Sequence, residues 1–457
     1  MAEFQEGDRI ALSGGGEACV VRLLGQGGQG AVYEVNIAGN PYALKWYTCH
    51  LQDRKAFKEN IRQNIEERER NLASDGKFLW PLFLTEDLKT GSSLSFGYVM
   101  ALRPPEFTDF PAILNAKDKG GGRVAFASTE VMILAALNLV NAFRSLHRRG
   151  LSYQDLNDGN FFINTVTGDV LICDNDNVTP DGKVNSGGVG GKPGYMAPEI
   201  VRGEAHPSER TDCHSLAVVL FKLFFRHSPL QGAAYEKLPC MTEKREMELF
   251  GTSPVFIYDP GDPSNRPVNG VHNNVIKLWP LFPQFFRDAF IHSFAKGMKN
   301  PQLRIIENEW QKLLVRLRDE WYVTCPSCGR AVFLQDSGPG AGLKCSGCGS
   351  SFSYPRRLSI KKGAVLYDIP LFPGKKIYTC HIVGDSDDYR GVLAEVVMNK
   401  NNPRLWGIKN LGAGTWKYRT PEGADKDTSP GGAVPIGPGV TVDFGGTSGT
   451  INEGGAV

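Results

Sequence analysis

The sequence lacks the features that mark secreted, membrane-spanning and nucleic-acid-binding proteins. Its 51 lysines and arginines nearly balance 49 aspartates and glutamates, so we expect no strong attraction to nucleic acid or to a membrane surface. The two longest apolar runs, Val131–Val140 and Leu216–Phe225, are too short to span a bilayer and are interrupted by Asn138 and Lys222. The N-terminus is acidic and has no apolar core, which argues against a signal peptide. We therefore predict a soluble cytoplasmic protein.

The arrangement of the cysteines does not indicate a disulfide framework. The chain has 10 cysteines in 457 residues, and those outside two C-x-x-C pairs are scattered. This usage predicts a metal site in a reducing compartment. With 41% apolar and 22% charged residues, the chain can fill globular cores. Its length indicates about three domains.

A glycine-rich turn joins two predicted strands, Val20–Leu24 and Ala31–Val35. The turn consists of Gly25, Gln26, Gly27, Gly28, Gln29 and Gly30. It fits G-x-G-x-x-G, a pattern that lets backbone N–H groups close on phosphate oxygens because no Cβ intervenes. No helix follows directly, which argues against a dinucleotide-binding turn. A plain hairpin is the alternative interpretation.

A lysine stands inside an otherwise apolar strand after this hairpin. The strand is Tyr42–Lys45, and its position predicts that Lys45 reaches a bound phosphate. The segment Gln52–Leu72 has apolar residues at helical spacing, and Glu66 and Glu69 lie near that stripe. A further strand is expected at Phe96–Leu102.

Three oxygen-bearing residues follow a predicted long buried helix, Thr129–His147. Asp155 and Asn160 are five residues apart, and Asp174 comes nineteen residues after Asp155. This spacing suits one carboxylate that orients a nucleophile and two oxygen ligands for a metal ion beside it.

In this order, the segments resemble the eukaryotic-type protein kinases. That family has G-x-G-x-x-G, V-A-I-K, H-R-D-x-x-x-x-N, D-F-G and A-P-E. Here Ala197-Pro198-Glu199 matches A-P-E. Asp212 matches the family aspartate that caps the catalytic-loop backbone from below, and Arg304 matches the arginine that pairs with the A-P-E glutamate, here Glu199. The resemblance implies an α+β, bilobal kinase fold over residues 1–319, with an N-lobe at 1–103 and a C-lobe at 104–319.

The resemblance also implies roles for individual residues. Asp155 is the expected catalytic base, and Lys45, held by Glu66 or Glu69, is expected to contact the ATP phosphates. Asn160 and Asp174 are the expected Mg²⁺ ligands. The other residues expected to contact ATP are Gly25, Gln26, Gly27, Gly28, Gly30, Val32, Ala43, Met100 and Leu102.

Several residues differ from the kinase family motifs. Tyr153 and Gln154 replace the His and Arg of H-R-D, Asn157 stands where Ser/Thr kinases usually have a lysine, and Asn175-Asp176 replaces Phe-Gly. Without the arginine, we expect activity that is independent of phosphorylation at activation-segment sites such as Thr179 or Ser186. No metal ligand or base is lost, so we predict an ATP- and Mg²⁺-dependent kinase for protein Ser or Thr. An ATP-binding pseudokinase scaffold and a small-molecule phosphotransferase are the alternatives.

Two cysteine pairs follow the kinase segment in the pattern C-x₂-C-x₁₆-C-x₂-C. The four residues are Cys325, Cys328, Cys345 and Cys348. Four thiolates with no open position predict a structural Zn²⁺ site in a zinc ribbon at residues 320–354. Two redox-active pairs would need a thioredoxin-like βαβ context that is absent, and a rubredoxin-like iron site is the remaining alternative.

The last segment is rich in short predicted strands. We expect a basic linker at Pro355–Lys362, a small all-β sandwich at residues 364–457 and a frayed end at Gly445–Val457. The predicted strands are Val365–Ile369, Lys376–Ile382, Leu393–Met398, Leu405–Asn410 and Val440–Phe444. The order of Leu371–Gly374, Trp406–Leu411, Gly414–Trp416 and Gly437–Gly439 resembles a degenerate forkhead-associated domain. The G-R and S-x-x-H elements that read phosphothreonine in that family have no clear match, so protein docking is the expected role.

Three aromatic segments make the resemblance more specific. Phe78–Pro81, together with the insert Leu249–Pro260 and Leu278–Pro280, resembles a bacterial kinase group associated with tellurite-resistance and phage-defence gene clusters. That group implies a role in bacterial signalling, stress or defence. The implied partners are a protein substrate, a von Willebrand A-type protein and a PP2C-type phosphatase.

Overall fold

The computed structural model describes residues 3–49, 51–68, 76–90, 93–115, 126–183, 191–335, 342–384 and 388–453. Glu69 and Ser186 lie outside these residues. The chain folds into two compact units. The first comprises residues 1–127, 134–276 and 289–310, and the second comprises residues 128–133, 277–288 and 311–457.

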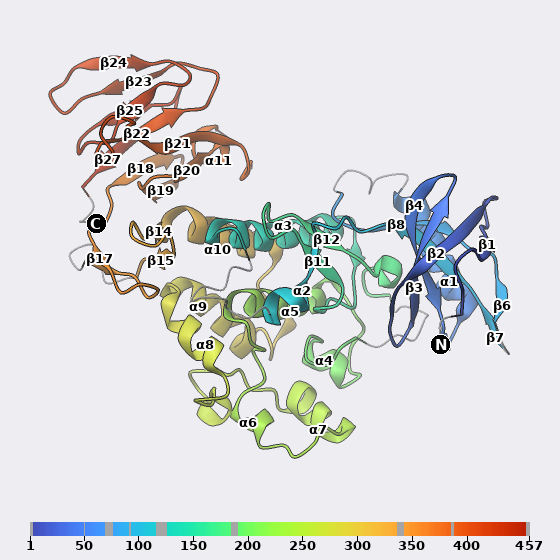
Figure 1. Ribbon diagram of the computed structural model, residues 1–457. Helices are drawn as coiled ribbons and strands as arrows, with labels where there is room; N and C mark the ends of the chain where they lie inside the picture. Colours follow the sequence, from blue (N-terminus) through green and yellow to red (C-terminus); the bar gives the residue numbers. More distant parts are fainter. Residues whose placement is uncertain are drawn as a thin grey trace. The chain divides into compact units, whose positions relative to one another are not determined.

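The first unit begins with an antiparallel six-stranded sheet, drawn in blue in Figure 1. In spatial order its strands are β1 (Arg9–Ala11), β2 (Glu17–Gln26), β3 (Gly30–Ile37), β4 (Asn40–Tyr47), β8 (Gly97–Ala101) and β5 (Pro81–Leu84). A short hairpin of β6 (Leu88–Thr90) and β7 (Ser93–Ser95) precedes β8. Strand alternation sends side chains to both faces of the sheet, and each face has its own apolar cluster.

Helix α1 (Arg54–Glu67) packs on one face of this sheet. The Asp53 carboxylate accepts a hydrogen bond from the Ala56 N–H at 2.9 Å and caps the helix. Phe57 and Ile61 lie one turn apart, both are fully buried, and both belong to the apolar cluster on that face. The predicted order of strands, glycine turn and helix is confirmed here.

The rest of the first unit is mainly helical. The helices wholly or partly in it are α2 (Phe110–Asn115), α3 (Thr129–His147), α4 (Pro198–Val201), α5 (Glu209–Phe225), α6 (Ala233–Glu236), α7 (Glu243–Met247), α8 (Asn273–Leu278), α9 (Gln284–Ile291) and α10 (Glu307–Glu320). Helix α5 is buried nearly all round, and its Phe221 ring contacts the rings of Phe256 and Phe290. Among the described residues, α3 is long and apolar enough to cross a membrane, but 56% of that stretch is buried within the fold, as in a core helix.

Five very short strands carry the loops of the candidate site. They are β9 (Thr108–Asp109), β10 (Leu151–Ser152), β11 (Phe161–Ile163), β12 (Val170–Ile172) and β13 (Thr179–Pro180). Strand β11 pairs with β12 and β9, and β10 pairs with β13. These pairings fix both ends of the loop from residue 153 to residue 160 and the start of the segment after β12.

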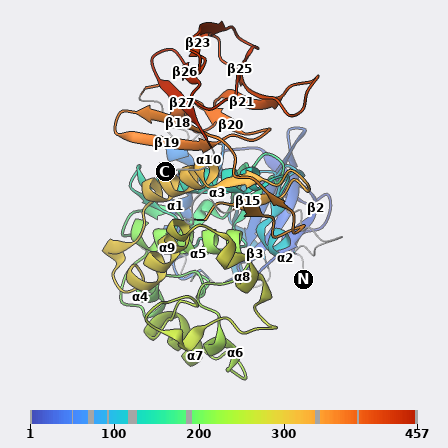
Figure 2. The ribbon, with the colours of Figure 1, turned by 90° about the vertical axis from the view of Figure 1, so that its left-hand side faces the viewer.

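The second unit contains two small hairpins and a two-sheet β-structure. The hairpins are β14 (Tyr322–Thr324) with β15 (Ala331–Phe333), and β16 (Leu343–Lys344) with β17 (Ser351–Phe352). The larger sheet has the order β19 (Val365–Pro370), β18 (Arg357–Lys362), β27 (Ser448–Asn452), β26 (Thr441–Asp443), β23 (Trp416–Arg419) and β24 (Asp425–Thr428). The smaller sheet has the order β20 (Lys376–Tyr378), β21 (Val392–Met398), β22 (Trp406–Asn410) and β25 (Ala433–Pro435), and α11 (Thr379–Ile382) follows β20. Both sheets, in orange to red in Figure 2, contribute to one apolar core.

Three sequence-based expectations for this unit are wrong. The expected basic linker contains β18, whose Leu358 and Ile360 are fully buried while its polar residues alternate with them. The expected frayed end contains β27, which pairs with both β18 and β26. Gly449 supports this packing because a Cβ there would lie 2.8 Å from the Leu358 side chain. The predicted strand Lys376–Ile382 ends at Tyr378, where α11 begins.

Candidate active site

Lys45 joins the sheet to the segment that follows β12. It lies on β4 opposite Val32 of β3, and its side chain is only 6% exposed. Its Nζ lies 3.1 Å from Gln29 Oε1, 3.2 Å from Asp174 Oδ1 and 3.1 Å from Asp176 Oδ2. Burial alone would lower the pKa of Lys45, but the Asp174 and Asp176 carboxylates outweigh it and raise the pKa. The ammonium group is therefore held charged between two carboxylates.

The expected glutamate partner on the helix is not found among the described residues. Among the described residues, the hydrogen bonds and ion pairs of Lys45 Nζ are made with Gln29, Asp174 and Asp176, and Glu69 lies outside this part of the chain. The buried face of α1 instead carries amides: Asn60 Nδ2 donates to the Asp176 carbonyl and Asn64 Nδ2 to the Asn175 carbonyl, each at 3.1 Å. Asp176 was missed as a partner because its position holds glycine in the family pattern. The sequence feature that could have identified it as a partner of Lys45 is its acidic side chain two positions after Asp174.

Asp155 and Asn160 are brought together by the loop between β10 and β11. Asn160 Nδ2 donates to the Asp155 carbonyl at 2.8 Å and approaches Oδ2 at 3.4 Å, and Asn157 Nδ2 donates to Oδ1 at 2.9 Å. Burial raises the pKa of Asp155 to about 6, and Asp174 adds to this rise against the hydrogen bond from Asn157. A carboxylate with this pKa is ionised near neutral pH and can accept a proton.

The same loop is held from beneath by a buried polar network. Asp212 accepts the backbone N–H of Tyr153 at 2.6 Å and of Gln154 at 3.0 Å, as the family resemblance implied. His147 bridges Asp212 at 3.1 Å and Glu307 at 2.8 Å. Burial lowers the pKa of His147, but the two carboxylates outweigh this effect and raise it to about 10. The network therefore contains an imidazolium at neutral pH.

Gln154 makes neutral contacts where the family has an arginine. Its φ is +74°, in the left-handed region, and its side-chain amide donates to the Thr179 hydroxyl and to the Lys183 carbonyl. Thr179 is itself 4% exposed. The segment after β12 is thus attached to the loop without a phosphate group.

A bidentate ion pair joins Arg304 to Glu199 of the A-P-E segment. Arg304 Nη1 and Nη2 donate to Glu199 Oε1 at 2.7 Å and Oε2 at 2.8 Å. The Arg304 side chain is only 2% exposed, so this pair is shielded from solvent. The expected pairing of these residues is found in the structure.

The apolar residues expected to contact ATP share one apolar cluster. Val32, Ala43, Met100 and Leu102 all belong to it, and Ala43 lies opposite Met100 in the β4–β8 pair. Two further members, Leu171 and Cys173, come from β12 and the residue after it and were not predicted. They were missed because they precede Asp174 as an ordinary buried strand.

The glycines of the turn divide into two kinds. A Cβ at Gly25, Gly27 or Gly28 would meet no atom within 4 Å, so protein packing does not explain these glycines. A Cβ at Gly30 would lie 2.0 Å from the Trp46 carbonyl oxygen, so this glycine is required by the β3–β4 pairing. The open space beside the first three fits a loop that closes on phosphate groups.

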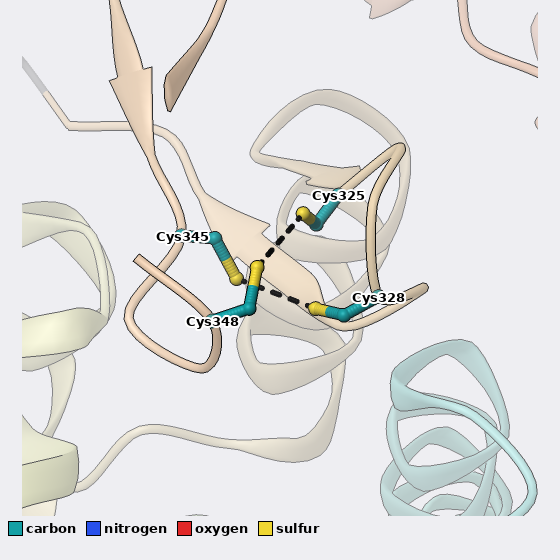
Figure 3. A group of neighbouring side chains, drawn as sticks. All are labelled: Cys325, Cys328, Cys345 and Cys348. Atoms are coloured by element: carbon teal, nitrogen blue, oxygen red, sulfur yellow. Dashed lines mark hydrogen bonds between the residues drawn. The ribbon is translucent and has the colours of Figure 1, made fainter. Parts of the chain in front are cut away.

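The four predicted cysteines lie together in the second unit, with their sulfurs facing one another (Figure 3). The Cys325 and Cys348 sulfurs are 3.7 Å apart, and those of Cys328 and Cys345 are 3.6 Å apart. A tetrahedral zinc with Zn–S bonds of about 2.3 Å separates its sulfurs by about 3.8 Å, so the donor set fits that ion. In each turn a glycine adopts positive φ, at Gly329 and Gly349. The two turns therefore have matching backbone geometry.

Comparison with known proteins identifies the first unit. The protein kinase domain family matches residues 19–278. Beta-adrenergic receptor kinase 1 of Mesocricetus auratus is 28% identical over 226 residues, which cover 46% of this chain and 29% of that protein. G protein-coupled receptor kinase 2 of Caenorhabditis elegans is 28% identical over 248 residues, 50% of this chain and 31% of that protein.

A plant relative shows a shorter match. CBL-interacting protein kinase 4 of Oryza sativa subsp. japonica is 28% identical over 119 residues, 25% of this chain and 26% of that protein. The chain thus spans less than a third of the length of each of these relatives. Since the kinase family matches more than half of its residues, this chain belongs to the protein kinase family.

Proposed function

We propose that this chain is an ATP- and Mg²⁺-dependent kinase that phosphorylates serine or threonine hydroxyls of a protein substrate. The observation that carries the proposal is the buried contact between Lys45 and Asp174, 3.2 Å from Nζ to Oδ1, beside the paired Asp155 and Asn160. These four residues come from three separate segments of the chain. Their meeting supports a phosphoryl-transfer site more strongly than any one motif does.

Each residue has a proposed task. Lys45 and the N–H groups of the glycine turn contact ATP phosphates, and Val32, Ala43, Met100 and Leu102 contact adenine. Asn160 and Asp174 hold Mg²⁺, which neutralises charge on the phosphate oxygens when bound. Asp155 orients the substrate hydroxyl and accepts its proton, a task that suits a carboxylate whose pKa burial raises to about 6.

The second unit has a proposed structural metal and a docking role. We propose that Cys325, Cys328, Cys345 and Cys348 bind one Zn²⁺ in a zinc ribbon at residues 320–354. The two hairpins are so small that metal binding, at roughly 10–16 kcal/mol, supplies much of their folding free energy. The two-sheet segment that follows is proposed to be a forkhead-associated-like domain that docks proteins.

The cellular setting is proposed from the sequence resemblance. We propose a cytoplasmic kinase of a bacterial signalling, stress or defence system, with a von Willebrand A-type protein and a PP2C-type phosphatase as partners. All 10 cysteines lie among the described residues and none of them forms a disulfide, which is consistent with a reducing compartment.

The test is transfer of labelled phosphate from ATP, with Mg²⁺, to protein substrates and to the chain itself. We compare the wild type with Asp155→Asn and with Asp109→Asn, a matched change at an aspartate whose side chain is 56% exposed. Loss of the base is expected to lower kcat by about 10²–10⁴-fold, and the control is expected to retain wild-type activity. Equal activity of wild type and Asp155→Asn would refute the assigned base, and phosphorylation of tyrosine alone would refute the substrate class.

A further inference from the structure

We propose that Asp176 is the positioning residue for Lys45. In protein kinases this role belongs to a glutamate on the helix that follows the lysine strand. The inference rests on the proposed kinase function, and it adds a residue to which the family pattern gives no such task. Three observations support it: the number of donors on Lys45, the burial of Asp176, and the contacts of helix α1.

The Lys45 ammonium group has three N–H donors and three acceptors. Among the described residues, three acceptor side chains therefore match the three donors, and Asp176 offers both of its oxygens. Of the three acceptors, Gln29 lies in the glycine turn and Asp174 is a proposed metal ligand. Both therefore belong to groups that face ATP and Mg²⁺ in the proposed site, which leaves Asp176 as the partner with no other task there.

The position of the Asp176 side chain is fixed by burial and by hydrogen bonds. Its side chain is 0% exposed, whereas that of Asp174 is 27% exposed and accessible to a metal ion. The Asp176 carboxylate also accepts hydrogen bonds from the hydroxyls of Tyr47 and Tyr98. Two buried tyrosines and one buried lysine therefore hold a single carboxylate, which fixes where Nζ points.

Helix α1 is bound to the same turn through neutral groups. Asn60 Nδ2 donates to the Asp176 and Val178 carbonyls, and Asn64 Nδ2 donates to the Asn175 and Val178 carbonyls, each at 3.1 Å. The helix therefore positions the turn, and the turn positions the lysine. Because Asp174 and Asp176 are two residues apart, one short segment sets both the metal ligand and the lysine.

Activity and binding are measured on the full chain in parallel. The variants are Asp176→Asn and the matched changes Glu66→Gln and Glu69→Gln, which test the two helix glutamates. We measure kcat and KM for ATP, and the Kd of a non-hydrolysable ATP analogue with Mg²⁺ by calorimetry. Because a misplaced catalytic group costs about 10²-fold in rate, Asp176→Asn is expected to lower kcat by about 10²-fold and to change the analogue Kd much less. Both glutamate variants are expected to behave as wild type.

Urea unfolding tests the same pair without catalysis. The variants are Lys45→Met, Asp176→Asn and the double variant, compared in a double-mutant cycle. In Lys45→Met alone, the buried Asp176 carboxylate loses its cation. The double variant also removes the charge of that carboxylate, so we expect it to be at least as stable as Lys45→Met. Tyr98→Phe removes a hydrogen bond to the same carboxylate and leaves the ion pair. It is expected to lower stability without the 10²-fold loss in kcat, which separates positioning from a merely structural role.

The outcomes are distinguishable. Additive effects in the cycle, or unchanged kcat in Asp176→Asn, would overturn the proposal. A loss of kcat in Glu66→Gln or Glu69→Gln that exceeds the loss in Asp176→Asn would also overturn it and assign the role to the helix. A wild type that transfers no phosphate would refute the proposed function, whereas the unfolding cycle and the analogue Kd would still decide whether Asp176 positions Lys45.

Discussion

The buried His147 predicts that this fold loses stability in mild alkali. Its pKa is raised to about 10 from an ordinary value of 6.5, because Asp212 and Glu307 outweigh the effect of burial. The folded state therefore keeps a proton that the unfolded chain releases. The stabilisation is fully present below pH 6.5 and is lost as pH rises through about 10.

The size of the effect follows from the same two values. A shift from 6.5 to about 10 corresponds to roughly 5 kcal/mol when the imidazolium is fully protonated in the folded state only. Between about pH 7 and pH 9, linkage predicts a loss of about 2–3 kcal/mol from the free energy of unfolding. The His147→Gln variant lacks the proton and is expected not to show this loss, although it is less stable at pH 7 because Asp212 and Glu307 lose their cation.

The assay is urea denaturation of both proteins across this pH range, followed by tryptophan fluorescence. Other groups that titrate are common to both proteins, so the difference between the two curves isolates His147. Hydrogen exchange of the peptide that contains Tyr153 and Gln154 supplies a local measurement, because both N–H groups donate to Asp212. Parallel stability curves from pH 6.5 to pH 9 would refute the argument.

Three further predictions concern other parts of the chain. Arg304→Met leaves Glu199 buried without its partner and is expected to lower the free energy of unfolding by about 3–5 kcal/mol, measured by urea denaturation; a surface-like loss below about 1 kcal/mol would contradict the buried-pair argument. Thr179→Ala is expected to retain phosphoryl transfer, because Gln154 also donates to the Lys183 carbonyl; activity that disappears after phosphatase treatment of the wild type would show that a phosphate is needed instead. Cys328→Ser is expected to lower the metal content of the purified protein from about one zinc per chain and to destabilise the hairpins, measured by elemental analysis and limited proteolysis; an unchanged zinc content would remove this cysteine from the site.

Local patterns in the sequence account for much of the fold and the site. The strand–turn–strand order around the glycines, the helix at Thr129–His147 and the two cysteine pairs follow from periodicity and spacing within short segments. Lys45, Asp155, Asn160 and Asp174 were identified because their order and spacing resemble the motifs of the protein kinases. Such features can be predicted without knowledge of the rest of the chain, because their geometry is set by neighbouring residues.

Pairings between distant segments could not be obtained in this way. Strand β27 pairs with β18 across about ninety residues, and it lies within the glycine-rich segment 445–457. Glycine is depleted in strands, so the composition of this segment concealed a strand that is favoured by burial against Leu358 and Ile360. Tyr153 is likewise buried in a position where the family has histidine, and its hydroxyl contacts the Cys173 carbonyl.

The sequence by itself determined which groups are available for chemistry: a lysine, an aspartate proposed as the base, two oxygen-bearing residues proposed as metal ligands, and four cysteines, each at a characteristic spacing. Only the tertiary structure decided which carboxylate holds the lysine. The sequence offered Glu66 and Glu69, of which Glu69 lies outside the described residues. The fold places Asp174 and Asp176 beside Lys45, at 3.2 and 3.1 Å. The physical reason is that a buried ammonium group takes the acceptors that the backbone brings within about 3 Å, and those distances depend on how the sheet, the helix and the turn pack together.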